Sequence, residues 1–118
     1  MSDYIMYYKV NCATSIEALK ILKQQGIKPE LRIYLEEIPT PAELKKLVNK
    51  LGIKPFGLVR TKERVYKENY EGKDFTDEEW LNILSENPIL IDRPILIKGN
   101  KAVIAKPPEE IPALLQNL

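Results

Sequence analysis

The sequence predicts an α/β fold in which a β-α-β unit and a β-β-α unit form one mixed four-stranded sheet. Three observations support this prediction: a strand–helix–strand pattern within the first 35 residues, a hairpin signal between two apolar runs near the C-terminus, and helix-capping patterns between them. The capping patterns indicate a helical insertion between the two halves, at about residues 40–87. A length of 118 residues is typical of one domain, so we expect residues 1–118 to form a single domain.

The N-terminal pattern begins with Tyr4-Ile5-Met6-Tyr7-Tyr8, which is short, aromatic and apolar, as expected of a buried strand. Thr14 and Ser15 then act as capping residues for a helix whose apolar residues recur at helical spacing until Gly26. Residues 31–35 alternate between apolar and more polar side chains and predict a second strand. Because a helix connects the two strands, we expect them to be parallel.

The middle of the chain predicts helices. Thr40-Pro41-Ala42-Glu43 combines an N-cap, a first-turn proline and a Glu that completes a capping box, and Gly52 ends this helix. A shorter helix follows Pro55. Residues 61–73 are polar and poorly patterned and predict turns that include one helical turn, and the capping box Thr76-Asp77-Glu78-Glu79 begins another helix.

The C-terminal part returns to strands. Residues 94–98 and 101–105 are mostly apolar and flank Gly99-Asn100, a two-residue loop that predicts an antiparallel hairpin. Pro107-Pro108 ends this pairing, and a short terminal helix is expected over residues 111–118. A parallel pair joined to an antiparallel hairpin in this order is the thioredoxin arrangement, so the predicted fold is thioredoxin-like.

The composition excludes several classes of function. The chain has no histidine, so neither a Ser-His-Asp triad nor a His-ligated metal site is possible. A net charge of +1 gives no electrostatic reason for nucleic acid or an anionic membrane to be a main partner. No apolar run is long enough to cross a bilayer, and the N-terminus Met1-Ser2-Asp3-Tyr4 has no features of a secretory signal. With one cysteine and no internal disulfide, a cytoplasmic location is expected.

The single cysteine, Cys12, lies between the first strand and the first helix. A helix N-terminus favours a negative charge, so this position favours the reactive thiolate. The polar residue Asn11 and the small residues Ala13, Thr14 and Ser15 around it argue against deep burial, although a free cysteine is also often an inert core residue. The spacing Cys12-Ala13-Thr14-Ser15 has the form C-x-x-S. Since serine cannot resolve a disulfide, turnover by Cys12 requires an external thiol, and Ser15 is equally explained as a helix cap or a first-turn residue that satisfies helix N–H groups.

The sequence resembles the single-cysteine arsenate reductases that use glutathione and glutaredoxin. The resemblance covers nearly the whole chain. Its motifs are Asn11-Cys12-Ala13-Thr14-Ser15, Tyr34-Leu35-Glu36 followed by Pro39-Thr40, Leu58-Val59-Arg60, and Asn87-Pro88-Ile89-Leu90-Ile91-Asp92-Arg93-Pro94-Ile95. The run that ends in Arg-Pro-Ile is the most specific of these motifs, because both its order and its distance from the cysteine agree.

The resemblance implies a thioredoxin-like fold with a helical insertion and a site built on Cys12 as the residue that attacks arsenate. It implies that Arg60 and Arg93 hold the oxyanion, and guanidinium suits this role because it offers paired donors to two oxygens. It also implies no bound cofactor, glutathione as a co-substrate and glutaredoxin as the protein that regenerates the thiol. The Arg93–Pro94 bond is a candidate for a cis peptide beside the cysteine, as in thioredoxin folds, and its isomer is open at this stage.

Two positions depart from the family pattern. Lys106, before Pro107, stands where the family has a third arginine, and it keeps the charge without the forked donors. Tyr8 stands where better-known members have a histidine, with Lys9 beside it as another source of positive potential. Asn11, Thr14, Ser15 and Pro94 are expected to support the site.

Three hypotheses about function therefore stand. The leading one is an arsenate reductase in which glutathione releases arsenite and glutaredoxin reduces the resulting mixed disulfide. The second, motivated by Lys106 and Tyr8, is a general glutathione-dependent thiol or disulfide reductase of the same family. The third is a non-catalytic regulator resembling the Spx-type proteins that bind RNA polymerase. Ser15 counts against this third hypothesis, because those proteins typically sense oxidants through a C-x-x-C pair.

Overall fold

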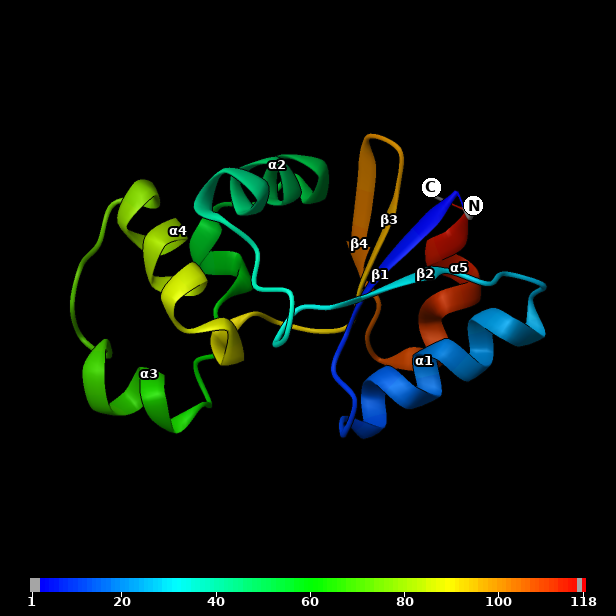
Figure 1. Cartoon of the computed structure of the whole chain (residues 1–118), viewed down its shortest axis with the longest axis horizontal. Helices are drawn as coiled ribbons and strands as arrows, with labels where there is room; N and C mark the ends of the chain where they lie inside the picture. Colours follow the sequence, from blue (N-terminus) through cyan, green and yellow to red (C-terminus); the bar gives the residue numbers. More distant parts are fainter. Residues whose placement is uncertain (1–2, 117) are drawn as a thin grey trace. The chain divides into compact units, whose positions relative to one another are not determined.

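The structure is a computed structural model of the chain, and it describes residues 3–116 and 118. Four strands form one sheet in the order β2-β1-β3-β4: β1 (Tyr4–Tyr8), β2 (Glu30–Ile33), β3 (Ile95–Lys98) and β4 (Lys101–Ile104) (Figure 1). β1 runs parallel to β2, and β3 runs antiparallel to both β1 and β4. The predicted β-α-β and β-β-α units and the Gly99-Asn100 hairpin are confirmed.

Five α-helices and three short 3₁₀ helices are present in the described part of the chain. The α-helices are α1 (Ala13–Gln24), α2 (Pro41–Leu51), α3 (Arg64–Asn69), α4 (Asp77–Glu86) and α5 (Ile111–Leu115), and the 3₁₀ helices are η1 (Pro55–Leu58), η2 (Pro88–Leu90) and η3 (Pro108–Glu110). Both predicted capping boxes are formed, with the side chains of Thr40 and Thr76 accepting the backbone N–H groups of Glu43 and Glu79. Gly52 ends α2 in the left-handed conformation, as predicted.

The boundaries that differ from the prediction include the ends of the second strand and of the terminal helix. The second strand ends at Ile33, because the Ile33 carbonyl accepts the N–H groups of Glu36 and Glu37 and turns the chain before it can extend to Leu35. The terminal helix ends at Leu115 and is preceded by η3. Residue 117 of the predicted segment lies outside the described residues.

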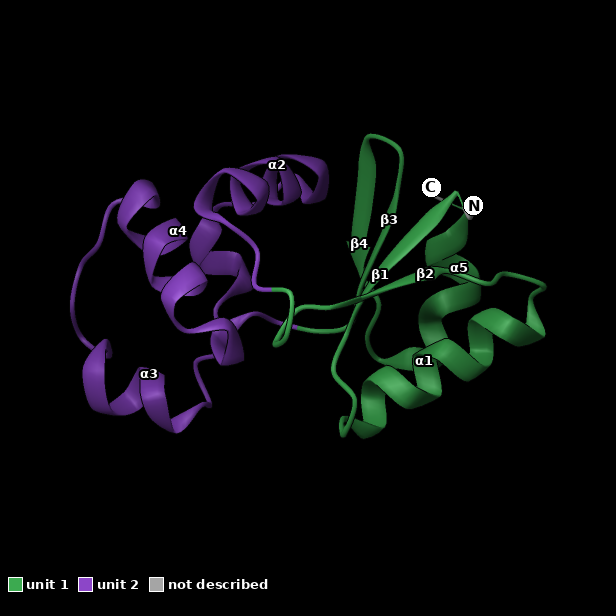
Figure 2. Cartoon of the chain, viewed as in Figure 1, with its two compact units in different colours: residues 1–37, 93–118 green, residues 38–92 purple. Residues whose placement is uncertain are grey.

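The chain divides into two compact units (Figure 2). Unit 1 comprises residues 1–37 and 93–118 and contains the sheet, α1 and α5, whereas unit 2 comprises residues 38–92 and contains α2, α3 and α4. The predicted insertion at about residues 40–87 falls within unit 2. Whether residues 1–118 act as a single domain stays a prediction.

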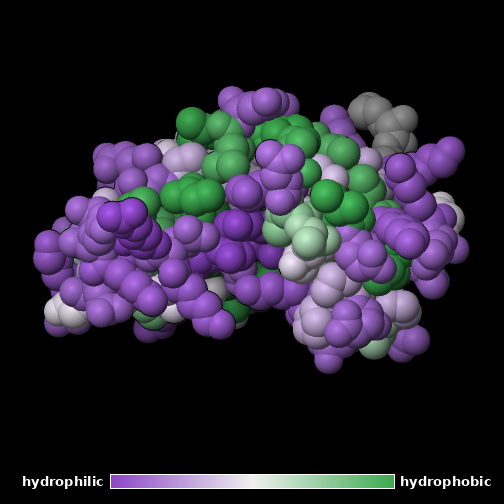
Figure 3. Space-filling model, turned by 90° about the horizontal axis from the view of Figure 1, so that it is seen from below, coloured by the Kyte–Doolittle hydropathy of each residue, from purple (hydrophilic) through white to green (hydrophobic). Residues whose placement is uncertain are grey.

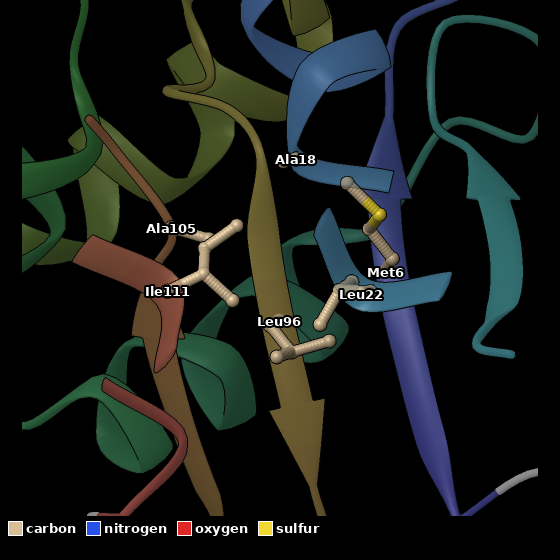
Figure 4. Close-up of a cluster of buried hydrophobic side chains, with 6 residues drawn as sticks. All are labelled: Met6, Ala18, Leu22, Leu96, Ala105 and Ile111. Atoms are coloured by element: carbon tan, nitrogen blue, oxygen red, sulfur yellow. The ribbon is translucent and has the colours of Figure 1, made fainter. Parts of the chain in front are cut away.

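The core of unit 1 joins one face of the sheet to its helices (Figure 4). Buried residues come from β1, α1, β3 and α5 and from the end of β4: Met6, Ala18, Leu22, Leu96, Ala105 and Ile111. Because α1 is anchored against β1 here, the loop that joins them has a fixed start and a fixed end. That loop carries Cys12.

Unit 2 has a cluster of aromatic side chains around the buried residue Trp80. The indole ring of Trp80 on α4 lies 5.1 Å from the ring of Phe56 and 5.0 Å from that of Phe75, between ring centroids. Tyr66 and Tyr70 complete the cluster at 6.3 and 6.2 Å from Trp80. These contacts explain how the polar segment 61–73 supports a helix, since α3 contributes Tyr66 to this aromatic cluster.

We expect Leu22→Ala to lower the free energy of unfolding by about 2–5 kcal/mol, because Leu22 is fully buried between α1 and the sheet. Urea denaturation followed by circular dichroism measures this loss. Ile16→Ala, on the same helix but half exposed, is the matched control and should change stability by less than about 1 kcal/mol. Equal losses in the two variants would contradict the core described here.

Candidate functional site

Cys12 is the residue that begins α1. Its N–H donates to the Lys9 carbonyl (3.2 Å), which closes the turn after β1, and its carbonyl accepts the N–H of Ile16 (3.0 Å) as the first hydrogen bond of the helix. The prediction that Thr14 and Ser15 cap this helix is wrong, because Cys12 occupies the N-cap, whereas the alternative placement of Ser15 in the first turn is confirmed. The sulfur therefore lies at the helix end where backbone N–H groups lack helical partners.

The surroundings of Cys12 favour its thiolate. Partial burial alone raises the pKa of the thiol, but hydrogen bonds from the backbone and side chain of Ser15, the side chain of Arg93 and the backbone of Thr14 lower it to about 7. Cys12 makes no side-chain capping hydrogen bond as a neutral thiol, so these donors act mainly on the ionised sulfur. About half of the Cys12 side chains are then thiolates at neutral pH.

Ser15 contributes a hydroxyl that is completely buried. Among the described residues its Oγ has no other hydrogen-bond partner, so its proton remains available to the Cys12 sulfur. The C-x-x-S spacing thus places Ser15 one helical turn beyond the cysteine as a donor. The cap interpretation of Ser15 is replaced by this contact.

Arg93 reaches the same sulfur from the other half of the chain. Arg93 is buried, with 7% of its surface exposed, and its side chain donates a hydrogen bond to the Cys12 sulfur. The Arg93–Pro94 peptide bond is cis, and the Pro94 carbonyl accepts the N–H of Ala105 (2.9 Å). This hydrogen bond connects the loop before β3 to the residue that follows β4. The structure therefore brings Cys12, Thr14, Ser15 and Arg93 together.

Arg60 belongs to unit 2. Its Nε lies 3.2 Å from Glu63 Oε1, and its Nη1 lies 3.6 Å from Asp92 Oδ1. The backbone on each side is paired as well, because the N–H of Arg60 donates to Leu90 and the N–H of Asp92 donates to Leu58, both at 2.8 Å. Sequence reasoning missed Glu63 and Asp92, although the i, i+3 spacing of Arg60 and Glu63 was a visible signal. That Arg60 joins Cys12 in one site stays a prediction.

Lys106 and Asn11 are both exposed. The Lys106 N–H donates to the Ile104 carbonyl (3.0 Å), and the Lys106–Pro107 bond is a second cis peptide that the sequence did not predict. Their part in binding a substrate stays a prediction.

Comparison with known proteins shows which family the chain belongs to. The family model described as "ArsC family" matches residues 7–114. The chain belongs to the ArsC family. It is 37% identical to the arsenate reductase of Haemophilus influenzae over 94% of this chain and 97% of that one, and 32% identical to the arsenate reductase of Neisseria meningitidis serogroup A over 98% and 100%. The solved structure of the arsenate reductase from Vibrio cholerae is similar with a TM-score of 0.87 and 35% identity, over 93% of this chain and 95% of that one.

The thioredoxin-like fold expected from the sequence agrees with this ArsC family membership and with the observed strand order. The resemblance to the arsenate reductase family is confirmed. In residues 3–116 and 118, no group of three or more acidic or cysteine side chains is arranged to hold a metal ion. Over the same residues, no helix has the length and apolar character needed to cross a membrane.

We expect the rate of Cys12 alkylation by iodoacetamide to rise with pH along a single titration with a midpoint near 7, because only the thiolate reacts and the pKa of Cys12 is lowered to about 7. Mass spectrometry of the modified chain at pH 5–10 measures this rate. A small thiol such as 2-mercaptoethanol, alkylated in parallel, is the control for the reagent. A midpoint near the ordinary value of about 8.5 would contradict the described environment.

Proposed function

We propose that this ArsC family chain reduces arsenate to arsenite with electrons from glutathione. The observation that carries the proposal is the contact between Arg93 and the sulfur of Cys12, whose pKa is lowered to about 7. A buried guanidinium beside an ionised sulfur is what attack on an anion requires, because both reactants are negative and repel each other without a fixed cation. The relatives named arsenate reductases support the choice of oxyanion.

In the first step, the Cys12 thiolate attacks arsenate, a bond forms between sulfur and arsenic, and an arsenate hydroxyl takes up a proton from solvent and leaves as water. Arg93 holds an oxygen of the anion during this step, with Ser15 and the backbone N–H groups at the start of α1 supporting the sulfur until it attacks. We propose that Arg60 and Lys106 supply the remaining positive charge. Asn11 and Thr14 shape the loop, and Pro94 positions Arg93.

In the second step, the thiolate of glutathione attacks the Cys12 sulfur. A disulfide forms, the sulfur–arsenic bond breaks, and its electron pair leaves with arsenic, which becomes arsenite. Because Cys12 is the only cysteine in the chain, no internal thiol can reduce this disulfide. Glutaredoxin then transfers the glutathionyl group to its own thiol and restores Cys12. The cycle needs no bound cofactor and requires a glutathione-rich, reducing compartment such as the cytoplasm.

The direct test incubates the purified chain with arsenate, glutathione, glutaredoxin and a glutathione-regenerating system, and measures arsenite by chromatography. We expect arsenite to accumulate and to require all three reactants. Arsenite at the background level of the reaction without the chain would reject the proposal.

Lys106 and Tyr8 keep the second hypothesis, a general disulfide reductase, as the alternative outcome. Lys106 is exposed and lacks a forked donor, so arsenate is held by fewer paired hydrogen bonds than the family pattern provides. A glutathionylated peptide added in place of arsenate distinguishes the two functions. Its reduction without any arsenite from arsenate would favour the general reductase.

A further inference from the structure

A cavity of about 460 Å³ lies along α1 in unit 1, outside the residues assigned above to catalysis or anion binding. It is lined by one residue at the end of β1 and one face of α1: Tyr8, Ile16, Leu19, Lys20, Lys23 and Gln24. Its volume lies within the range of small-molecule pockets. We propose that this cavity binds the tripeptide portion of glutathione while its sulfur exchanges with Cys12, an inference that rests on the proposed function.

Two of the residues that line the cavity, Tyr8 and Ile16, lie close to Cys12 along the chain. Tyr8 is the last residue of β1 before the turn that leads to Cys12, and the N–H of Ile16 donates to the Cys12 carbonyl at 3.0 Å. Long side chains on a helix lean toward its N-terminus, so Lys20 and Lys23 lean toward the end that carries Cys12. Lys20 follows Cys12 by about 12 Å along the helix axis, and a tripeptide spans about 10 Å. The axial separation exceeds the tripeptide length by about 2 Å, and the lean of the Lys20 side chain toward the start of the helix makes up this difference.

The walls of the cavity match the chemistry of glutathione. The tripeptide carries two carboxylates and one ammonium, and the cavity offers two ammonium groups, Lys20 and Lys23, with the neutral amide of Gln24. Among the described residues, neither lysine forms an ion pair within the chain. Of the residues that the structure describes, none that lines the cavity is acidic, and the half-exposed side chain of Ile16 provides an apolar wall for the peptide stem.

Apolar surface lies among hydrophilic residues on the face seen from below, the side on which α1 runs (Figure 3). Ile16 and Val10 are both large apolar residues of unit 1 that are about half exposed, with 50% and 54% of their surfaces accessible. One follows and one precedes Cys12 in the sequence. A small anionic peptide therefore meets cations on α1 and apolar surface near the sulfur.

The inference is tested with a reaction that contains no arsenate. The Cys12 thiolate attacks one sulfur of oxidised glutathione, a new disulfide joins Cys12 to one glutathionyl group, the original disulfide breaks, and the other glutathione leaves as a thiolate. The rate of this step is compared with the rate on bis(2-hydroxyethyl) disulfide, a neutral molecule that undergoes the same exchange without carboxylates. Mass spectrometry of the modified chain follows both reactions.

We expect Lys20→Ala to slow the exchange with oxidised glutathione by roughly threefold, and the double variant with Lys23→Ala by about tenfold, since a threefold change for each lysine is the effect of losing one partly exposed ion pair. The rate with the neutral disulfide should stay within about 1.5-fold of that of the unmodified chain, because Cys12 itself is unchanged. Lys46→Ala on α2, which removes an exposed lysine outside the cavity, is the matched control and should alter neither rate.

The outcomes separate this inference from the proposed function. If both disulfides react with Cys12 and the lysine variants change neither rate, the cavity does not bind glutathione. The reactivity of the Cys12 thiolate, which the proposed function needs, is then still supported. An equal slowing of both disulfides would also overturn the inference, because it would mean that the lysines act on the sulfur rather than on the tripeptide. If Cys12 reacts with neither disulfide, the proposed function itself fails.

Discussion

Cys12→Ser is expected to reduce arsenite production to the background rate, a loss of at least about a thousandfold. A serine hydroxyl stays protonated at neutral pH even beside Arg93 and the first turn of α1, so it does not attack arsenate at a useful rate. It also cannot form the disulfide with glutathione that carries the electrons. Both halves of the proposed cycle are therefore blocked by the exchange of one atom, which leaves the packing of the half-buried side chain nearly unchanged.

The measurement is arsenite formed per chain under conditions that saturate the unmodified enzyme with glutathione. Ala13→Ser is the matched control, because it places a serine hydroxyl one residue away at an exposed position and leaves the sulfur in place. It should retain most of the activity. Arsenite formation by Cys12→Ser at more than a few per cent of the unmodified rate would remove the sulfur from the mechanism.

Local sequence signals predicted most of the fold because each of them is satisfied by neighbouring residues. The capping boxes at Thr40 and Thr76 close within one helical turn, and Gly52 ends α2 by its own backbone conformation. The hairpin at Gly99-Asn100 likewise depends on adjacent residues. Such signals do not need the rest of the chain, so they can be recognised in the sequence alone.

The start of α1 was predicted incorrectly for a related reason. Thr14 and Ser15 are good capping residues, and local propensity favours them over cysteine. The anchoring of α1 on β1 through Met6, Ala18 and Leu22 instead starts the helix at Ala13 and makes Cys12 its N-cap. Tertiary packing therefore determines where the helix starts. With the helix starting at Ala13, Ser15 is not the cap and instead donates a hydrogen bond to the Cys12 sulfur.

The candidate site was predicted in part. The position of Cys12 at a strand–helix junction is a local property and was visible in the sequence. Its contact with Arg93 joins residues 81 positions apart, and only the antiparallel pairing of β1 with β3 brings the start of β3 to the end of β1. No periodicity or spacing encodes such a contact, so before the structure the pairing of Cys12 with Arg93 rested on the family resemblance alone.

Arg93→Ala should have the second large effect, lowering kcat/KM for arsenate by about 10²–10³-fold. This is the usual loss when one buried donor to a developing negative charge is removed. Arg93 has 7% of its surface exposed. Water that enters the space left by the side chain is uncharged and does not replace the positive charge of the guanidinium. Arg64→Ala is the matched control, since Arg64 lies on the surface with 88% of its side chain exposed and, in the described part of the chain, pairs with Glu68. We expect that variant to retain full activity.

A second readout separates the chemistry of Arg93 from a merely structural role. Because the hydrogen bond from Arg93 lowers the pKa of Cys12, its removal should raise the midpoint of Cys12 alkylation above 7 toward the ordinary thiol value. Arg93→Lys keeps a positive charge but loses the paired donors, so it should restore part of the lowered pKa while leaving kcat/KM for arsenate well below that of the unmodified chain. If Arg93→Ala lost activity with the alkylation midpoint unchanged, Arg93 would serve the fold or the anion alone. The thiolate would then depend on Ser15 and the helix N-terminus without it.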